Sequence, residues 1–331
     1  MSKLVSEPVA KSQKIVTFRR RGDRFFRGLL IVGGLTAFLV LAGIFGYLVQ
    51  TAVPALQVFG FEFFTGSSWY SGDGLLPSEG SVDPPTFGLF PMLWGSVLIA
   101  IISLGLAVPF GVGVALSVTF FLPKRLKLAL TVLIDLVAAI PSVIFGLWGF
   151  FTLIPHGVLW ASWINEKLGF IPFFRVEFDA FEQSPFMAGI VLGIMITPIV
   201  AAITREIFSQ VPPDLISAAK ALGSSRWTMI RQVVLPFSKS GIAGGAMLGL
   251  GRALGETVAV FFVLQLYFDG VNWYRILESS GGSIASLIIS KFGEAQPLEI
   301  SALFAAGLAL FVVTLLANAG AAYLVNRTKA K

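Results

Sequence analysis

The sequence contains no cysteine and a single histidine, His156, among its 331 residues. Disulfides and thiolate metal sites are therefore excluded, and one histidine cannot form a metal site alone. Charge is also scarce, because 13% of the residues are charged whereas 56% are hydrophobic, and the mean hydropathy is +0.84. This composition excludes an ordinary soluble domain and predicts a membrane protein. We expect neither a bound metal nor a cofactor.

The sequence also lacks the motifs of an enzyme. No Gly-Lys dipeptide occurs in the chain, which excludes a phosphate-binding loop of the GxxxxGK[ST] type. No Ser/His/Asp, paired-histidine or carboxylate constellation is present that would suit a membrane-embedded enzyme. We therefore expect a protein that is not an enzyme and that has no nucleotide site of its own.

Long hydrophobic runs dominate what is present. A helix needs about 20 mostly apolar residues to cross the hydrocarbon core of a bilayer. The first such run follows an arginine-rich stretch and has no Ala-x-Ala cleavage site, so it is predicted to be a retained span and not a signal peptide. The fold class is predicted to be an all-α polytopic membrane protein with six transmembrane helices. The predicted spans are 28–49, 91–121, 126–154, 186–208, 241–268 and 299–325.

The distribution of the 24 Lys and Arg residues predicts the orientation of these spans. If the spans alternate in direction, one side carries only Lys167, Arg175, Arg275 and Lys291, and the other side carries almost all the rest. The positive-inside rule then places both termini in the cytoplasm. The pI of 9.7 reflects this topology and does not indicate binding to nucleic acid.

This orientation gives a domain plan in which the core follows one preceding span. The Gly-, Pro- and Ser-rich stretch 66–85 is expected to form an outer loop, and 155–185 another. The plan consists of a cytoplasmic basic tail 1–27, the first transmembrane helix 28–49, a periplasmic loop 50–90, a core 91–325 with the inner loop 209–238, and a cytoplasmic tail 326–331.

Prolines and glycines inside the runs predict a packed helical bundle. Pro109, Pro141 and Pro198 each remove a backbone hydrogen bond, and in lipid the freed carbonyl must find another partner. The spacings Gly241/Gly245/Gly249 and Gly251/Gly255 allow close helix packing.

The inner loop PPDLISAAKALGSSRWTMIRQVVLP, residues 212–236, predicts an elbow of two short helices. Pro213 and Asp214 suit a helix start and Gly223 a stop. Ser224 or Ser225 can cap a second helix, which Pro236 is expected to end. Lys220, Arg226, Trp227 and Arg231 would form an amphipathic surface for a groove on a partner.

The spacing in this loop resembles the EAA motif of bacterial ABC-importer permeases. Ala218, Ala219, Gly223, Leu235 and Pro236 are in register with the motif. Val233 replaces its Ile, and Ser217 replaces its Glu, which removes any salt bridge that this acid would make in the ATPase groove. An amphipathic loop that lies on the membrane surface is the alternative. The resemblance implies that the ATPase contacts Ser217, Ala218, Ala219, Gly223, Arg226, Trp227, Leu235 and Pro236.

More of the chain resembles one branch of this family, the phosphate-specific PstC permeases. The resemblance implies a type I ABC importer (MetI-like) fold in the bacterial inner membrane. It also implies three partners: a second, PstA-like permease subunit, a cytoplasmic PstB-like ATPase dimer and an external PstS-like phosphate-binding protein. Sulfate or molybdate import, and ion-coupled secondary transport, are the alternatives. The segments that carry the resemblance are GDRFFRGLL (22–30), FGLFPMLWGSV (87–97), AVPFGVGVAL (107–116), LIDLVAAIPSVIFGLWGF (133–150), AGIVLGIMITPI (188–199), GLGRALGETVAV (249–260) and SALFAAGLALFVVTLLAN (301–318).

Within GRALGETVAV, residues 251–260, Arg252 and Glu256 interrupt an apolar run. An arginine near the centre of a span costs about 2.5–3.5 kcal/mol on insertion scales, so something must compensate for it. The two residues are one turn apart and are predicted to share a helix face. They are predicted to form a structural ion pair, or a site at which Arg252 offers its N–H donors to a phosphate oxyanion in a transient passage, and the two roles can alternate.

Three hydroxyl residues could line the same route. They are Ser142 beside Pro141, Thr197 before Pro198, and Thr257 beside the charged pair. Each could equally satisfy its own helix by donating to a backbone carbonyl. Asp135 is expected to pair with a basic residue near the inner interface.

Overall fold

The computed structural model describes residues 21–72, 84–177, 179–279 and 281–329. Most of the predicted basic tail (1–20), the middle of the predicted loop (73–83) and the last two residues lie outside this range. The chain divides into two compact units, residues 1–47 and 48–331. Helix α1, Arg21–Phe59, crosses the boundary between them. Its apolar part is longer than the predicted span 28–49, because the hydrophobic pattern continues through Pro54 to Phe59.

Six helical segments in the described residues are long and apolar enough to cross a membrane, which confirms the predicted number of spans. Four of these segments lie at the predicted positions, and each of the four is helical over most of its length. The six segments are Phe25–Phe59, Phe90–Phe121, Ser142–Leu168, Pro185–Ser209, Arg226–Gly255 and Pro297–Tyr323.

The third predicted span, 126–154, is wrong as a single helix. Helix α4, Lys124–Ala138, ends before Pro141, and α5, Ser142–Trp148, begins directly after it. Proline lacks the N–H that would continue α4 and restricts the residue before it, so the two helices separate. The apolar helix then continues through a π-helical turn into α6, Ile154–Leu168, and the first half of the predicted loop 155–185 is helical.

The fifth predicted span, 241–268, is also wrong in its bounds. Helix α10, Leu235–Gly255, ends within it, Glu256 is extended, and the short helix α11, Val258–Val263, follows. On the other side the helix begins earlier, because α9, Arg226–Met229, continues through a π-helical turn into α10. The expectation that Pro236 ends this helix is therefore wrong.

Wide π-helical turns precede three of the prolines in the described residues. In an α-helix the proline ring meets the carbonyl four residues earlier, and a π-turn widens the backbone at that point. Each of the three π-turns in the described residues is followed by a proline at the second position after it. These are Ser117–Phe121 before Pro123, Gly149–Leu153 before Pro155, and Ile230–Val234 before Pro236.

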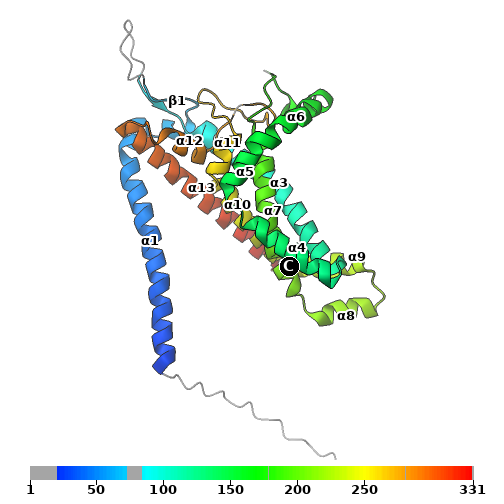
Figure 1. Ribbon diagram of the computed structural model, residues 1–331. Helices are drawn as coiled ribbons and strands as arrows, with labels where there is room; N and C mark the ends of the chain where they lie inside the picture. The colour runs from blue at the N-terminus through cyan, green and yellow to red at the C-terminus, as the bar shows by residue number, and fades with distance from the viewer. Residues whose placement is uncertain (1–20, 73–83, 178, 280, 330–331) are drawn as a thin grey trace, which may run out of the picture. The chain divides into compact units, whose positions relative to one another are not determined.

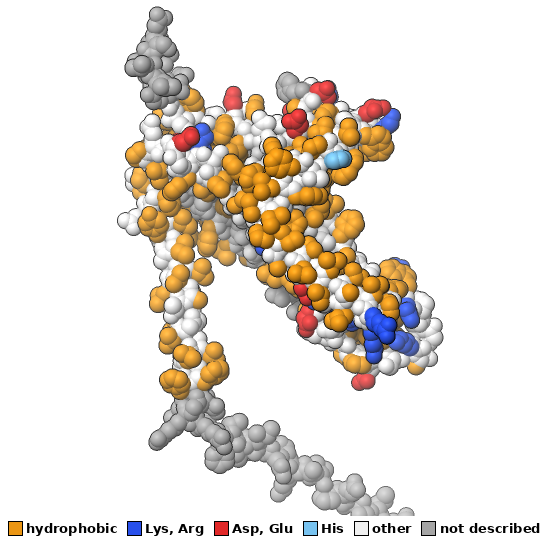
Figure 2. Space-filling model, in the orientation of Figure 1, with side chains coloured by type: hydrophobic (Ala, Val, Ile, Leu, Met, Phe, Trp, Pro, Cys, Tyr) orange, Lys and Arg blue, Asp and Glu red, His pale blue; other side chains and the backbone are white. Residues whose placement is uncertain are grey.

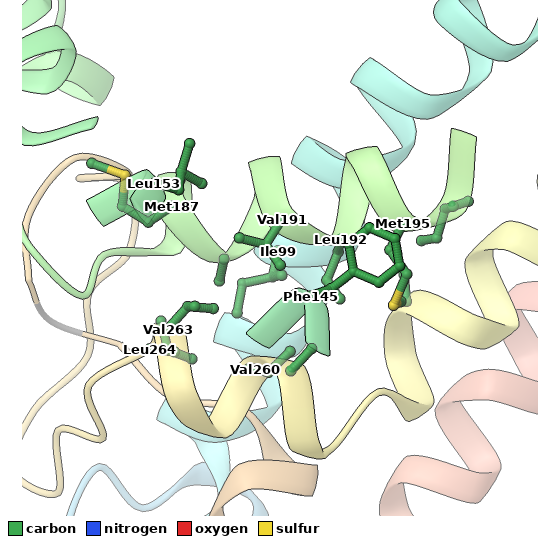
Figure 3. Packing of buried hydrophobic residues seen from close by; sticks show 14 of the residues in the cluster. Ile99, Phe145, Leu153, Met187, Val191, Leu192, Met195, Val260, Val263 and Leu264 are labelled. Carbon is green, nitrogen blue, oxygen red and sulfur yellow. The ribbon is translucent and has the colours of Figure 1, made fainter. Parts of the chain in front are cut away.

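Helix α7, Pro185–Ser209, is the centre of the second unit (Figure 1). It packs on α3, Phe90–Leu116, and on α10, and Figure 3 shows α5 and α11 closing over its buried face. Close packing with α10 depends on glycine, because a Cβ at Gly241, Gly245 or Gly249 would contact the isoleucines of α7. This confirms the predicted use of that spacing. Gly251 and Gly255 face open space in the described structure.

At the end of the second unit opposite the elbow, a small hairpin and two helices meet (Figure 1). Trp69 is buried and donates from its indole nitrogen to Oε1 of Glu299 at 3.0 Å, so this end of the predicted loop 66–85 packs into a core. The hairpin consists of β1, Trp69–Tyr70, antiparallel to β2, Thr86–Phe87. The two helices are α12, Ile284–Lys291, and α13, Pro297–Lys329, and the short helix α2, Glu62–Thr65, precedes the hairpin. Elsewhere, a 3-10 turn, Pro172–Phe174, follows α6.

A serine of α13 forms hydrogen bonds with backbone groups of α1 near its proline. The Ser301 hydroxyl donates to the carbonyl of Thr51 at 2.8 Å and accepts from the N–H of Ala55 at 3.0 Å. It therefore inserts into the hydrogen-bond ladder of α1 beside Pro54. In lipid such groups need a partner from within the protein, and α13 supplies it.

Candidate functional site

Arg252 and Glu256 meet at the place where α10 ends. Nη2 of Arg252 lies 4.0 Å from Oε2 of Glu256, although the two residues are not on one continuous helix as predicted. Arg252 occupies the last turn of α10, where the helix dipole favours a cation. The Glu256 side chain is 9% exposed and the Arg252 side chain 37%. The charges thus partly neutralise each other at a break in the backbone.

The guanidinium of Arg252 has few partners. Apart from Glu256, its Nη2 contacts the sulfur of Met195 on α7 at 3.9 Å, and thioether sulfur is a weak acceptor. Its Nε is buried and has no hydrogen-bond partner in the described structure. Buried donors of native proteins are nearly always satisfied, so an orphaned arginine nitrogen requires an explanation. Nothing in the sequence indicated the contact with Met195.

Glu256 is also loosely held. Its Oε1 accepts from the N–H of Ala259 in α11 at 3.5 Å, at the limit of a hydrogen bond. A carboxylate this buried is costly unless it is well paired. Both members of the pair therefore retain hydrogen-bonding capacity.

A cavity of about 430 Å³ opens beside this break. Gly255 and Thr257 line it on one side, and residues of α12 and α13 line the other. The Thr257 hydroxyl is 3.3 Å from the carbonyl oxygen of Gly255. Non-helical backbone at membrane depth is tolerated where it is buried in protein or lines a cavity, and the break satisfies both conditions.

The structure does not bring Ser142 or Thr197 into contact with the pair. The Thr197 hydroxyl donates to the carbonyl of Gly193 at 2.7 Å, within its own helix. Ser142 is the first residue of α5, and Gly146, one turn later, packs on Ala259 of α11. The local alternative therefore applies to Thr197.

A second arginine in an apolar helix, Arg205, also has a buried nitrogen, Nη1, without a partner in the described residues, but its ion pair joins two helices. Arg205 of α7 lies 3.4 Å from Oδ1 of Asp135 on α4, which confirms that Asp135 pairs with a basic residue. The Arg205 side chain is 22% exposed, and its pair joins two helices that are 70 residues apart in sequence. This pair fastens α4 to α7.

The elbow is capped at the turn between its two short helices. Helix α8, Pro213–Ala221, carries Asp214 in its first turn and Lys220 in its last, as the dipole favours. At the end of α8, Gly223 has a φ of +79°. The N–H of Gly223 donates to the carbonyl of Lys220 at 2.9 Å, and the N–H of Ser224 donates to the carbonyl of Ala219 at 3.1 Å. This is a Schellman motif, which requires the left-handed conformation at Gly223.

The second helix of the elbow is capped by Ser225 and not by Ser224. The Ser225 hydroxyl accepts from the N–H of Thr228 at 3.2 Å. The two short helices thus have fixed ends, and the sequence signals for both were local.

The elbow is anchored on one side and exposed on the other. Ala219 is buried in a cluster with Phe208, Met229 and Ile230, which attaches the elbow to the bundle. Leu222 and Trp227, by contrast, are 87% and 58% exposed. The outer side of the elbow thus leaves two large apolar side chains open to contact. Of the predicted contact residues, Ser217, Ala218, Gly223, Arg226, Trp227 and Pro236 are exposed, whereas Ala219 and Leu235 pack inward.

The charged side chains separate toward the two ends of the second unit. Figure 2 shows Lys and Arg gathered around α8, α9 and the start of α4, and most Asp and Glu at the other end. The elbow therefore lies at the basic end of the bundle.

Comparisons with known proteins identify the family of the chain. Residues 107–330 match the family described as the binding-protein-dependent transport system inner membrane component. The chain is 39% identical to the phosphate transport system permease protein PstC 2 of Mycobacterium tuberculosis, covering 96% of this chain and 97% of that protein. It is 40% identical to PstC of Mycobacterium leprae, covering 91% and 92%, and 37% identical to PstC of Haemophilus influenzae, covering 88% and 89%.

Solved structures share the fold. A chain of the bacterial alginate ABC transporter, crystallised in complex with an alginate pentasaccharide-bound periplasmic protein, superposes with a TM-score of 0.58 at 18% identity, covering 93% of this chain and 98% of that one. A second alginate-importer structure gives a TM-score of 0.55 over 92% and 98%. The predicted importer-permease fold is confirmed. The chain belongs to the family of binding-protein-dependent transport system inner membrane components, the permease subunits of ABC importers.

Proposed function

We propose that this chain is the permease subunit that carries inorganic phosphate across the bacterial inner membrane. The observation that carries the proposal is the underbonded Arg252 at a helix break beside a cavity. The names of relatives that match over nearly the whole chain support phosphate as the solute. The basic end around the elbow supports a cytoplasmic elbow and cytoplasmic termini under the positive-inside rule.

The proposed mechanism is an exchange of partners at Arg252. With the passage closed, Glu256 and Arg252 neutralise each other. When the passage opens, the guanidinium turns its free donors to the phosphate oxygens, where a planar fork can bind two oxygens at once. Low local dielectric strengthens this attraction, and Glu256 restores the closed state after release. Thr257 would line the passage, with Ser142 at its edge and Thr197 there only as a side chain already bonded within α7.

The energy would come from a separate ATPase dimer, PstB-like in kind, that docks on the elbow. The proposed contacts are the exposed Ala218, Gly223, Arg226 and Trp227, with Ser217 in the place of the motif's acid. A capped and anchored elbow can transmit a rigid-body push that alternates access to the passage. The chain itself then needs no nucleotide site.

A second, PstA-like permease subunit would complete the passage. An exposed stripe on α10, formed by Gly244, Leu248, Gly251 and Gly255, lies on the side of the helix that also carries Arg252. Small residues on such a stripe let another helix approach closely. A PstS-like phosphate-binding protein would dock at the opposite, periplasmic end.

Uptake of radiolabelled phosphate by the reconstituted complex tests this function, with sulfate and molybdate as competitors. Arg252→Gln should abolish uptake while the protein stays in the membrane and keeps its ATPase. Lys239→Gln removes the same charge from an exposed position of the same helix and should leave uptake unchanged. Normal uptake in Arg252→Gln would refute the role of the arginine, and competition by sulfate as strong as by phosphate would refute the choice of solute.

A further inference from the structure

An apolar groove lies between α3 and α4, away from the Arg252 site. Its volume is about 490 Å³, and Ser117 is the one polar side chain among its nine lining residues. The Ser117 hydroxyl donates to the carbonyl of Gly113 at 2.9 Å, so it offers no free donor to a ligand. The groove therefore suits a hydrocarbon chain and not a polar solute.

Helix α4 leaves this side of the bundle uncovered. None of its fifteen residues is buried. Leu130 and Ile134 face the groove from α4, and Phe110 of α3, which also lines it, is 64% exposed. Phe110 belongs to an apolar segment long enough to cross a membrane, so the α3 side of the groove is open to lipid.

A cluster of cations marks one end of the groove. Lys124, Arg125 and Lys127 are exposed in the first turn of α4, and in the described structure none of them forms an ion pair. Lys127 precedes Leu130 by three residues and so lies on the groove side of the helix. The sequence from Ser117 to Ile134 contains no acid, so the cluster is uncompensated within this segment.

These charges do not serve α4 itself. Cations in the first turn of a helix oppose its dipole, and the N-cap residue, Pro123, makes no side-chain cap. The positive-inside rule accounts for basic residues at this end of the bundle, but it does not account for an apolar groove that leads away from them. An anion with a long apolar tail would match both features.

We propose that the groove between α3 and α4 binds one anionic phospholipid, with an acyl chain between the helices and its phosphate headgroup at Lys124, Arg125 and Lys127. Basic pockets between helices on the cytoplasmic side have the chemistry to hold such headgroups. The proposal takes the cytoplasmic position of this end from the proposed function. It does not depend on which solute is carried.

Two glycines on α3 give a matched test. A Cβ at Gly113 meets nothing within 4 Å, because this residue lines the groove, so Gly113→Leu should fill the groove without disturbing the bundle. Gly105 also has open space around it and does not line the groove, which makes Gly105→Leu the control. A third variant, Lys124→Gln/Arg125→Gln/Lys127→Gln, removes the headgroup site and leaves the groove.

The complex solubilised from membranes is equilibrated with equal amounts of phosphatidylglycerol and phosphatidylcholine that carry the same acyl chains. Lipid retained after gel filtration is counted by mass spectrometry. The wild type and Gly105→Leu should retain phosphatidylglycerol severalfold over phosphatidylcholine, Gly113→Leu should lose the retained lipid, and the triple variant should lose the preference. Equal retention of both lipids by the wild type would overturn the proposal. The proposal would also be overturned if Gly113→Leu kept its lipid, or if Gly113→Leu released a protein subunit and no lipid. None of these outcomes measures transport, so the proposed function is tested separately.

Discussion

In the elbow and at the Arg252–Glu256 break, one helix ends and another begins, but the two places differ in how many of their backbone and side-chain donors are hydrogen-bonded. In the elbow, Gly223 closes a Schellman motif and Ser225 caps the next helix. At the break, α11 has no side-chain cap from its N-cap residue Thr257, and Nε of Arg252 is buried without a partner. The turn of the elbow is therefore capped on both sides, whereas the break leaves a buried donor without a partner in the described structure.

This difference separates a rigid part from a part that can exchange partners. A segment with satisfied caps and a buried anchor keeps its shape when a force is applied, so it can transmit motion. A buried polar group with incomplete partners lies closer in free energy to alternative arrangements. We therefore expect substitutions in the elbow to act on docking and shape, and substitutions at the break to act on flux.

After Arg252→Gln, the largest effect is expected for Gly223→Val. Valine at φ of +79° is strained by about 1–3 kcal/mol, which is about 5- to 150-fold in the equilibrium constant for the correct elbow. The amount of ATPase that co-purifies with the chain and the phosphate uptake should both fall by about this factor. Gly223→Asn, which tolerates the left-handed conformation, should keep most of both. If Gly223→Val co-purified with as much ATPase as the wild type, the ATPase would not depend on the shape of the elbow for binding.

Glu256→Gln tests the break. Removing the charge leaves Arg252 without its counter-ion, and the arginine should hold the anion too long or lose its closed-state position. We expect uptake to fall about tenfold, equivalent to about 1.4 kcal/mol, while the amount of protein in the membrane stays normal. Quantitative immunoblotting beside the uptake assay checks both. If the protein is lost in proportion to the flux, the acid is a structural neutraliser only.

The sequence was most informative where its signals are local. Pro213, Asp214 and Gly223 determine caps within a few residues of themselves, and the elbow forms as they predict. The six spans also follow from composition, because apolar length decides whether a helix partitions into lipid. Both features depend on short-range chemistry.

The sequence was least informative about breaks and contacts inside the membrane. Apolar character continues across Pro141 and across Glu256, so hydropathy joins segments that the backbone separates. The contact between Arg252 and Met195 depends on α10 packing against α7 through glycines, and these residues are 57 positions apart in sequence. Composition reports which segments enter lipid and not which side chains meet there.

A third arginine provides a fully paired reference outside the membrane. Arg275 contacts Glu177 at 2.6 Å and Glu278 at 3.2 Å and so joins two loops. Burial lowers the pKa of Arg275, but the hydrogen bonds and charges of Glu278 and Glu177 outweigh it, and its pKa is raised. A raised pKa gives stability that is lost only when the pH passes the folded value, which for arginine lies above any working pH.

Arg275→Gln should therefore lower stability and spare transport, the reverse of Arg252→Gln. Loss of both pairs leaves the 7%-exposed Glu278 side chain without its cation, and we expect a cost of about 1–3 kcal/mol. Thermal unfolding of the purified complex measures it, and the loss relative to the wild type should not vary between neutral and alkaline buffers. A change in uptake at unchanged stability would assign Arg275 a role in the passage or in docking.

The smallest effects are expected for two threonines that differ in what their hydroxyls face. Thr257 lines the cavity and has only a 3.3 Å contact with Gly255, whereas Thr197 is bonded at 2.7 Å within its own helix. Thr257→Val should lower uptake about threefold, within the range of one neutral hydrogen bond, and Thr197→Val should change it by less than about twofold. Both substitutions remove the same hydroxyl and preserve the volume, so initial uptake rates compare them directly. Equal losses would mean that the passage runs along α7 as well as along the break, and a larger loss for Thr197→Val would place it at α7.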